Sequence, residues 1–252
     1  EDHFSYLNVN DIVQGNGKVF AASENAVFIY DILTNELETI TTVNGLSGEF
    51  ITKIHYSENY NLLIIGYENG LIEVYNESDK SVLSVVDILE KPTIPPDNKI
   101  INHFNEFNNV VYISTDFGIS VYDLERLEFG DTYFIGNGGS QIIVNETAIF
   151  GDYIYAACSN SSGIRRALVA SEGLINFQEW TQIVPGDFEG IQQIQDKLYT
   201  TGLNRKIYEV IGVSLMELFT YNTLPLDIKS SNNNLVVSTK DNVFVYDENF
   251  TL

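Results

Sequence analysis

The chain of 252 residues has few basic side chains, cysteines and histidines. Only 13 lysines and arginines oppose 35 aspartates and glutamates, so the formal net charge is −22. Binding to nucleic acid or to an anionic membrane surface needs a basic footprint, and this balance argues against both partners. One cysteine, Cys158, excludes an internal disulfide. One cysteine and three histidines are few ligands for a His/Cys metal site. No cofactor is expected.

Long hydrophobic runs and helical periodicity are also missing. No apolar stretch approaches the roughly 20 residues of a membrane-spanning helix. Hydrophobic residues nevertheless make up 44% of the chain, which is enough to build a core. The sequence starts at Glu1 without an initiator methionine or a signal-peptide core, so we expect a processed or trimmed part of a longer chain.

One pattern recurs along the chain: a hydrophobic run, a small or polar turn, and a second run that often ends in Tyr-Asp or Tyr-Asn. Clear copies cover residues 18–31, 62–76, 110–123 and 235–247, and weaker ones cover 153–168 and 197–210. Each copy predicts a β-hairpin. We expect the repeated tyrosines to pack in the core or between neighbouring repeats; they are Tyr30, Tyr75, Tyr122, Tyr208 and Tyr246.

Two further elements flank each hairpin. Upstream lies a pair of mostly apolar residues three apart, and successive pairs are 37 to 50 residues apart. Downstream strands are predicted over 37–40, 81–87, 127–135, 175–183 and 214–221.

Four strands per repeat of about 40 residues predict an all-β, six-bladed β-propeller with four-stranded antiparallel blades, in one domain over residues 1–252. The sixth repeat has only residues 249–252 in the downstream place, so the N-terminal strand 3–7 is expected to complete it and close the ring. A seven-bladed propeller is the alternative.

The residues enclosed by each upstream pair are mostly polar. The innermost strands of a propeller line its central channel, so these side chains either solvate the channel or form a funnel that receives a ligand or partner group. The candidate binding residues are Asn10, Asp11, Thr52, Lys53, Asn102, His103, Asn145, Glu146, Glu189 and Asp227.

No catalytic motif is found. Asn137-Gly-Gly-Ser140 is rich in glycine but lacks the lysine of a phosphate-binding loop, so it predicts a turn. We expect Cys158 to be a small buried hydrophobe and Trp180 to pack between blades from an outer strand.

Several stretches resemble known propellers. The segment Asn44-Gly-Leu-Ser47, with the hairpin at 62–76, resembles the regulatory-propeller repeat of sensor ectodomains in Bacteroidetes-type bacteria. Residues 3–138 are similar to the N-terminal propeller of PorZ-like proteins of the type IX secretion system. The stretches that carry this resemblance are 3–6, 16–25, 44–47, 65–70, 117–123 and 132–136.

The resemblance implies a non-enzymatic, exported protein at the outer-membrane surface or in the periplasm. PorZ-like proteins work with the sortase complex that attaches cargo to anionic lipopolysaccharide. The implied partners are therefore proteins of that complex and lipopolysaccharide or another glycan, with the domain itself a monomer. Full-length relatives add a second propeller and a secretion-signal domain, which this sequence lacks.

Two alternatives remain open: the ligand-sensing ectodomain of a hybrid two-component system, and a propeller lyase or hydrolase. The enzyme would need histidine, arginine or carboxylate side chains clustered at one channel mouth.

Overall fold

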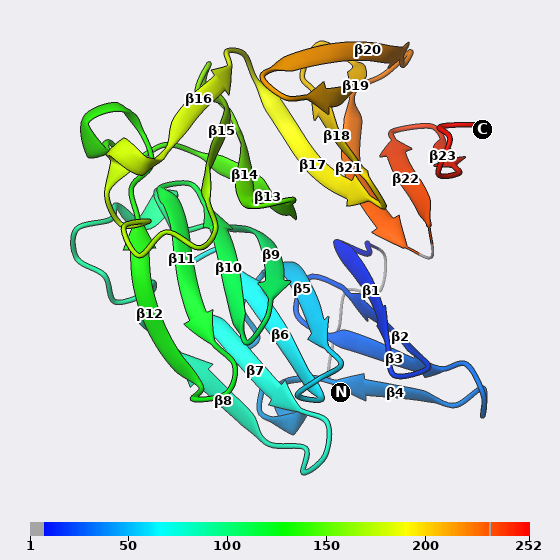
Figure 1. The fold of residues 1–252 in the computed structure, drawn as a ribbon. Helices are drawn as coiled ribbons and strands as arrows, with labels where there is room; N and C mark the ends of the chain where they lie inside the picture. Colours follow the sequence, from blue (N-terminus) through cyan, green and yellow to red (C-terminus); the bar gives the residue numbers. More distant parts are fainter. Residues whose placement is uncertain (1–7, 232) are drawn as a thin grey trace. The chain divides into compact units, whose positions relative to one another are not determined.

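The computed structural model describes residues 8–231 and 233–252, whose regular structure is β-strand with short 3-10 turns (Figure 1). Six antiparallel sheets follow one another along the chain, and each is built from consecutive strands. This confirms the predicted six-bladed β-propeller. Five blades have four strands, and the sixth has three within the described residues. The predicted strand 3–7, with the ring closure assigned to it, lies outside them.

The first three blades contain twelve strands. Blade 1 comprises β1 (Asp11–Gly15), β2 (Lys18–Ala22), β3 (Val27–Asp31) and β4 (Leu37–Ile40). Blade 2 comprises β5 (Ile51–Ser57), β6 (Leu62–Tyr67), β7 (Ile72–Asn76) and β8 (Val82–Val85). Blade 3 comprises β9 (Ile101–Phe107), β10 (Val110–Thr115), β11 (Gly118–Asp123) and β12 (Glu128–Tyr133).

The remaining blades follow the same order. Blade 4 comprises β13 (Val144–Phe150), β14 (Tyr153–Cys158), β15 (Gly163–Leu168) and β16 (Thr181–Val184). Blade 5 comprises β17 (Phe188–Ile194), β18 (Lys197–Gly202), β19 (Lys206–Ile211) and β20 (Ser214–Thr220). Blade 6 comprises β21 (Pro225–Ser231), β22 (Asn234–Thr239) and β23 (Val243–Tyr246).

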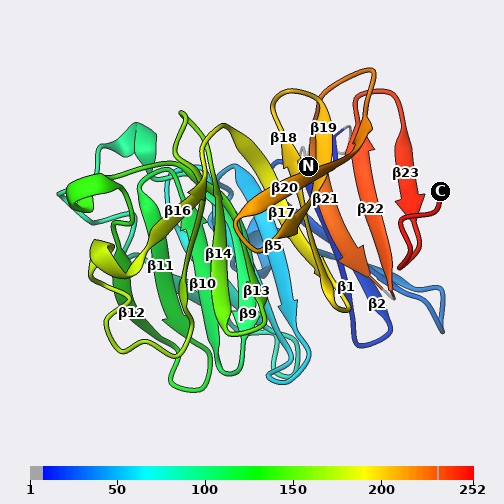
Figure 2. The ribbon, with the colours of Figure 1, turned by 45° about the horizontal axis from the view of Figure 1, so that its top comes forward.

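The chain divides into two compact units, residues 1–115 with 121–130 and residues 116–120 with 131–252. In the first unit, the innermost strand β5 lies beside both β1 and β9. In the second, β17 lies beside both β13 and β21 (Figure 2). Within each unit, polar side chains on one innermost strand can therefore reach the next. The single domain over 1–252 stays a prediction.

Packing between blades buries both faces of the middle strands. All six residues of β6 are buried, because the sheet is covered on each side. Phe20 of blade 1 stacks on Tyr56 of blade 2 with ring centroids 4.6 Å apart. The turn between β1 and β2 is Asn16-Gly17, and both residues have positive φ, 51° and 72°. An Asn-Gly pair suits such a two-residue hairpin turn.

Three of the repeated tyrosines are buried as predicted, Tyr208 packs partly buried against the core of blades 4 and 5, and Tyr30 departs from the prediction. Tyr75, Tyr122 and Tyr246 are at most 4% exposed. Tyr30, however, is 39% exposed, and its hydroxyl donates to the Asn35 side chain in its own hairpin at 2.7 Å. The equivalence assigned to Tyr208 was wrong by two residues. It pairs with the fourth residue of β18, Thr200, whereas Tyr75 pairs with the second residue of β6.

The outer strand of blade 4 is shorter than predicted. It covers Thr181–Val184 instead of residues 175–183, because Asn176 caps a 3-10 turn at Phe177–Glu179. Trp180 therefore precedes the strand. Its indole is buried and donates to the carbonyl of Leu174 at 2.9 Å. Cys158 is fully buried at the end of β14, as predicted.

Candidate functional site

The predicted channel residues lie at the start of the innermost strands, where the chain bulges. In blades 2 to 6, one residue is skipped in the pairing with the second strand; the skipped residues are Thr52, Asn102, Asn145, Glu189 and Leu226. A β-bulge leaves the extra residue outside the ladder and redirects its side chain. Four of the five skipped residues are polar, and the fifth, Leu226, is 66% exposed.

Donors at these positions bond to the next blade. In the first unit, the Asn10 amide donates to the Ile51 carbonyl at 2.9 Å, and the Thr52 hydroxyl donates to the Ile101 carbonyl at 2.7 Å. In the second unit, the Asn145 amide donates to the Phe188 carbonyl at 2.7 Å. Each acceptor belongs to the first residue of the neighbouring innermost strand.

Acceptors stand one residue later. A carboxylate oxygen of Asp11 accepts the backbone N–H of Ile54 at 2.9 Å, and one of Glu146 accepts that of Ile191 at 2.9 Å. Both acidic residues are only 5% exposed. Asn-Asp in blade 1 and Asn-Glu in blade 4 therefore make the same pair of bonds to the following strand. We call this pair the blade clamp.

The other predicted residues are half-buried on the same strands. Lys53 lies on β5, and Asn102 and His103 lie on β9. Asp227 lies on β21, where it accepts the N–H of Ile228 at 3.1 Å and approaches Lys229 to 4.0 Å. The structure thus gathers six predicted residues along β1, β5 and β9 and four along β13, β17 and β21. Their role in binding a ligand stays a prediction.

Glu189 differs from its counterparts. It occupies the donor position of the clamp, but an ionised carboxylate has no proton to donate. Burial raises the pKa of Glu189, and the nearby charge of Asp187 raises it further. Its neighbour Gly190 occupies the acceptor position, where a Cβ atom would come within 2.6 Å of a Glu146 carboxylate oxygen. The side chains of Glu146 and of Ile228, whose Cγ2 would be nearer still at 2.2 Å, therefore take the space that a larger residue would need.

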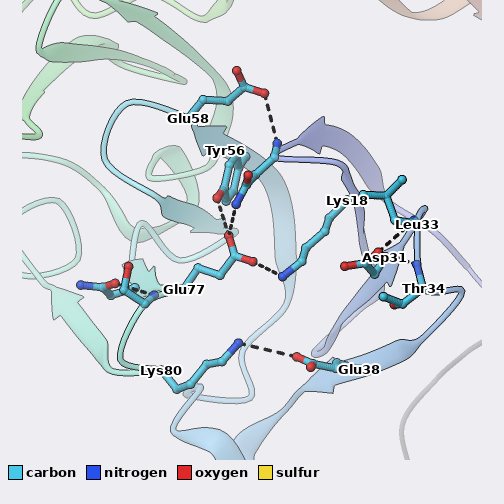
Figure 3. A network of polar contacts seen from close by, with 12 residues as sticks. Lys18, Asp31, Leu33, Thr34, Glu38, Tyr56, Glu58, Glu77 and Lys80 are labelled. Carbon is cyan, nitrogen blue, oxygen red and sulfur yellow. Dashed lines mark hydrogen bonds and ion pairs between the residues drawn. The ribbon is translucent and has the colours of Figure 1, made fainter.

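A second polar cluster joins blades 1 and 2 at the other end of their strands (Figure 3). The carboxylate of Glu77 receives hydrogen bonds from Lys18 and from the hydroxyl of Tyr56. Burial alone would raise the pKa of Glu77, but these bonds outweigh it and hold the pKa below its usual value. Nearby, Lys80 pairs with Glu38 at 3.6 Å. The chain uses two of its few cations in this cluster.

Sequence reasoning missed a groove of about 490 Å³ formed by three loops of blades 2 and 3. Its lining combines three acidic residues with an aromatic ring, an amide and two apolar side chains: Glu49, Phe50, Glu68, Asn69, Pro96, Asp97 and Ile100. We call it the Phe50 groove. The loops that form it vary in length between repeats, so the repeat pattern alone could not identify it.

Within 8–231 and 233–252, no three His, Cys, Asp or Glu side chains are grouped so that they could hold a metal ion. No helix in this part of the chain is long and apolar enough to cross a membrane.

Comparison with known proteins gives one family. The sequence profile described as the N-terminal β-propeller domain of PorZ, of the type IX secretion system, matches residues 19–181. No curated protein sequence matches the chain.

Solved structures share the fold. PorZ of Porphyromonas gingivalis, described as an essential surface component of the type IX secretion system, aligns with a TM-score of 0.80 and 16% identity over 96% of this chain. The chain spans about a third of that protein, 32%.

Two extracellular sensor domains of B. thetaiotaomicron are also similar. The one assigned to a hybrid two-component system has a TM-score of 0.73 and 13% identity, over 98% of this chain and 35% of its own. The one assigned to a one-component system has a TM-score of 0.71 and 13% identity, over 97% of this chain and 34% of its own. At these identities the likeness shows the fold alone.

Proposed function

The chain belongs to the family of PorZ N-terminal β-propeller domains, and from this we propose that it is a non-enzymatic binding propeller of the type IX secretion machinery at the cell surface. The observation that carries the proposal is the family match over residues 19–181. In this role the propeller would hold protein partners of the sortase complex, which attaches secreted cargo to anionic lipopolysaccharide.

The blade clamp favours a scaffold role for the domain over a catalytic role. Asp11 and Glu146 are the most buried of the predicted channel carboxylates, and both accept backbone amides of the next blade. The second oxygen of each is also engaged, that of Asp11 by the N–H of Ile12 and that of Glu146 by the side-chain amide of Gln192. Buried groups engaged in this way stabilise the arrangement of the blades.

The charge restricts how the domain would meet lipopolysaccharide. A net charge of −22 repels a polyanion over the screening length of the buffer. Contact with lipopolysaccharide would therefore use neutral sugar hydroxyls, and protein partners with basic surfaces are favoured. The channel residues Asp11, Lys53, His103, Glu146, Glu189 and Asp227 are the candidate polar funnel for such contacts.

The test is a binding series with the 252-residue chain immobilised. Purified sortase-complex proteins, anionic lipopolysaccharide and neutral oligosaccharides would be titrated at low and physiological salt. We expect saturable binding of at least one sortase-complex protein, weakening as salt rises. Absence of binding to every complex member would contradict the proposal. The Asp227→Asn variant tests the funnel without breaking the clamp, since unchanged binding of all ligands would show that Asp227 only lines the channel.

The second candidate is a sensor ectodomain, favoured by the similarity to the two B. thetaiotaomicron extracellular domains. In that case, neutral oligosaccharides would bind in the same series and sortase-complex proteins would not. The outcome separates the two functions directly.

A further inference from the structure

The Phe50 groove presents three carboxylates around an exposed aromatic ring. Glu49, Glu68 and Asp97 line it, and Phe50 is 44% exposed. None of the seven lining residues is basic. Three other carboxylates of this unit each have a cationic partner or a histidine: Glu77 with Lys18, Glu38 with Lys80, and Glu106 with His55. The groove carries negative charge that no cation of its lining balances.

The loops hold the groove in a fixed form. The carbonyl of Phe50 accepts the N–H of Glu68 at 3.0 Å, which ties the loop before β5 to the turn between β6 and β7. On one side of Phe50, the N–H of Ile51 donates to the backbone carbonyl of Glu24 at 2.8 Å. On the other, the N–H of Ser47 donates to the buried carboxylate of Glu73 at 3.0 Å. A ligand would find the backbone that carries Phe50 already ordered, which lowers the entropic cost of binding.

The same unit contains a second hollow in which a carboxylate and an aromatic ring contact a lysine. A smaller hollow of about 290 Å³ is lined by Glu38, Tyr75 and Lys80, among others. There the ammonium of Lys80 lies 5.8 Å from the centre of the Tyr75 ring and 3.6 Å from a Glu38 oxygen. A lysine thus combines a carboxylate with an aromatic face. The Phe50 groove offers the same two partners, with the cation missing from its lining.

We propose that the Phe50 groove binds a lysine or arginine side chain presented by a partner protein. The ammonium or guanidinium group would meet Glu49, Glu68 and Asp97, and its aliphatic stem would lie on Phe50, Pro96 and Ile100. This assignment deepens the proposed function, because it names the chemistry of the partner that the scaffold holds. Complementary charge across such a surface chiefly sets specificity and association rate.

The test uses short acetylated, amidated peptides, Gly-Lys-Gly and Gly-Arg-Gly, with Gly-norleucine-Gly as the uncharged control. Chemical shifts of Phe50 and Asn69 in the full chain would report occupancy. We expect the two cationic peptides to shift these signals and the norleucine peptide to bind about tenfold more weakly. Equal binding of all three peptides would assign the groove to a neutral ligand and overturn the proposal.

Variants locate the effect. Glu49→Gln/Glu68→Gln/Asp97→Asn should weaken the cationic peptides about tenfold, and Phe50→Ala about two- to fivefold. The matched control Glu36→Gln/Glu125→Gln/Glu128→Gln removes the same charge from exposed positions of this unit outside the groove lining. If the control weakens binding as much as the groove variant, only the general field of the protein acts and the proposal fails.

The same variants separate this inference from the proposed function. If a sortase-complex protein binds the groove variant as well as it binds the parent chain, the scaffold role stands and the groove assignment fails. If the cationic peptides bind in the groove but no complex member binds the chain, the groove stands and the proposed function fails.

Discussion

Glu146 on β13 accepts the backbone amide of Ile191 on β17 at 2.9 Å, and the acceptor is almost completely buried. Asp11 makes the same bond to Ile54, 135 positions earlier in the chain. A buried N–H that loses its acceptor carries the full cost of its desolvation. The two carboxylates therefore act as fixed links between neighbouring blades, whatever else meets them.

The first prediction concerns this link. Glu146→Ala should destabilise the protein by about 1–3 kcal/mol, because the amide of Ile191 loses its partner. Glu146→Gln keeps an acceptor oxygen and should cost less. Urea denaturation measures both, with the exposed Glu172→Ala as control. Equal stability of the alanine variant and the control would show that the bond is dispensable.

The second prediction concerns the Asn44-Gly-Leu-Ser47 segment. Glu73, 1% exposed, accepts the Ser47 amide and the hydroxyl of Tyr67. Glu73→Ala should lower the free energy of unfolding by about 2–4 kcal/mol, because two buried donors lose their acceptor. Hydrogen exchange of the Ser47 amide should accelerate most, because that N–H loses its acceptor. Unchanged exchange at Ser47 would contradict this account of the segment.

The third prediction concerns Cys158. Burial raises the pKa of its thiol to about 12, and the positive charge of Arg165 acts against this shift without cancelling it. The thiolate is the reactive form, so native protein at pH 8 should react with a disulfide reagent at least roughly a thousandfold more slowly than the unfolded chain. The reagent should titrate one thiol per chain in denaturant. Rapid reaction of the native protein would refute the assignment as a buried hydrophobe.

The repeat in the sequence was sufficient to predict the blades. The alternation of apolar and polar residues marks each strand, and the regular length of the repeat marks each blade. It also predicted where the polar residues of the innermost strands lie. It could not predict their partners. Asn145 and Phe188 are 43 residues apart, and their bond depends on a bulge and on the packing of β13 beside β17.

The Phe50 groove was out of reach for a different reason. Phe50, Glu68 and Asp97 lie on three loops, and loop conformation is set by local turns and by a few long-range hydrogen bonds. The bond from the Glu68 amide to Phe50 is one of these. Tyr208 shows an error of another kind, in which the sequence pattern assigned a residue to the wrong repeat position. An aromatic residue near the right place suggested an equivalence that the register of β18 and β19 contradicts.

The last prediction concerns pH and Glu189. Burial, with a contribution from Asp187, raises the pKa of Glu189 in the folded protein above its usual value. The folded state therefore binds this proton more tightly than the unfolded state does. By linkage, the stabilising effect is complete below the unfolded pKa, about 4.5, and is lost as the pH rises through the folded pKa. At neutral pH the ionised, partly buried carboxylate therefore destabilises the folded state.

Glu189→Gln removes the buried negative charge without changing the size of the side chain. It also supplies N–H donors at a position where Asn10, Thr52 and Asn145 donate. We expect the variant to be more stable than the parent chain at pH 7, by up to about 1 kcal/mol if the amide gains one hydrogen bond. The difference should shrink towards pH 4. Urea denaturation of both proteins from pH 4 to 8 measures it, with Glu172→Gln as the exposed control. A stability difference that does not change with pH would mean that Glu189 titrates alike in the folded and unfolded chains.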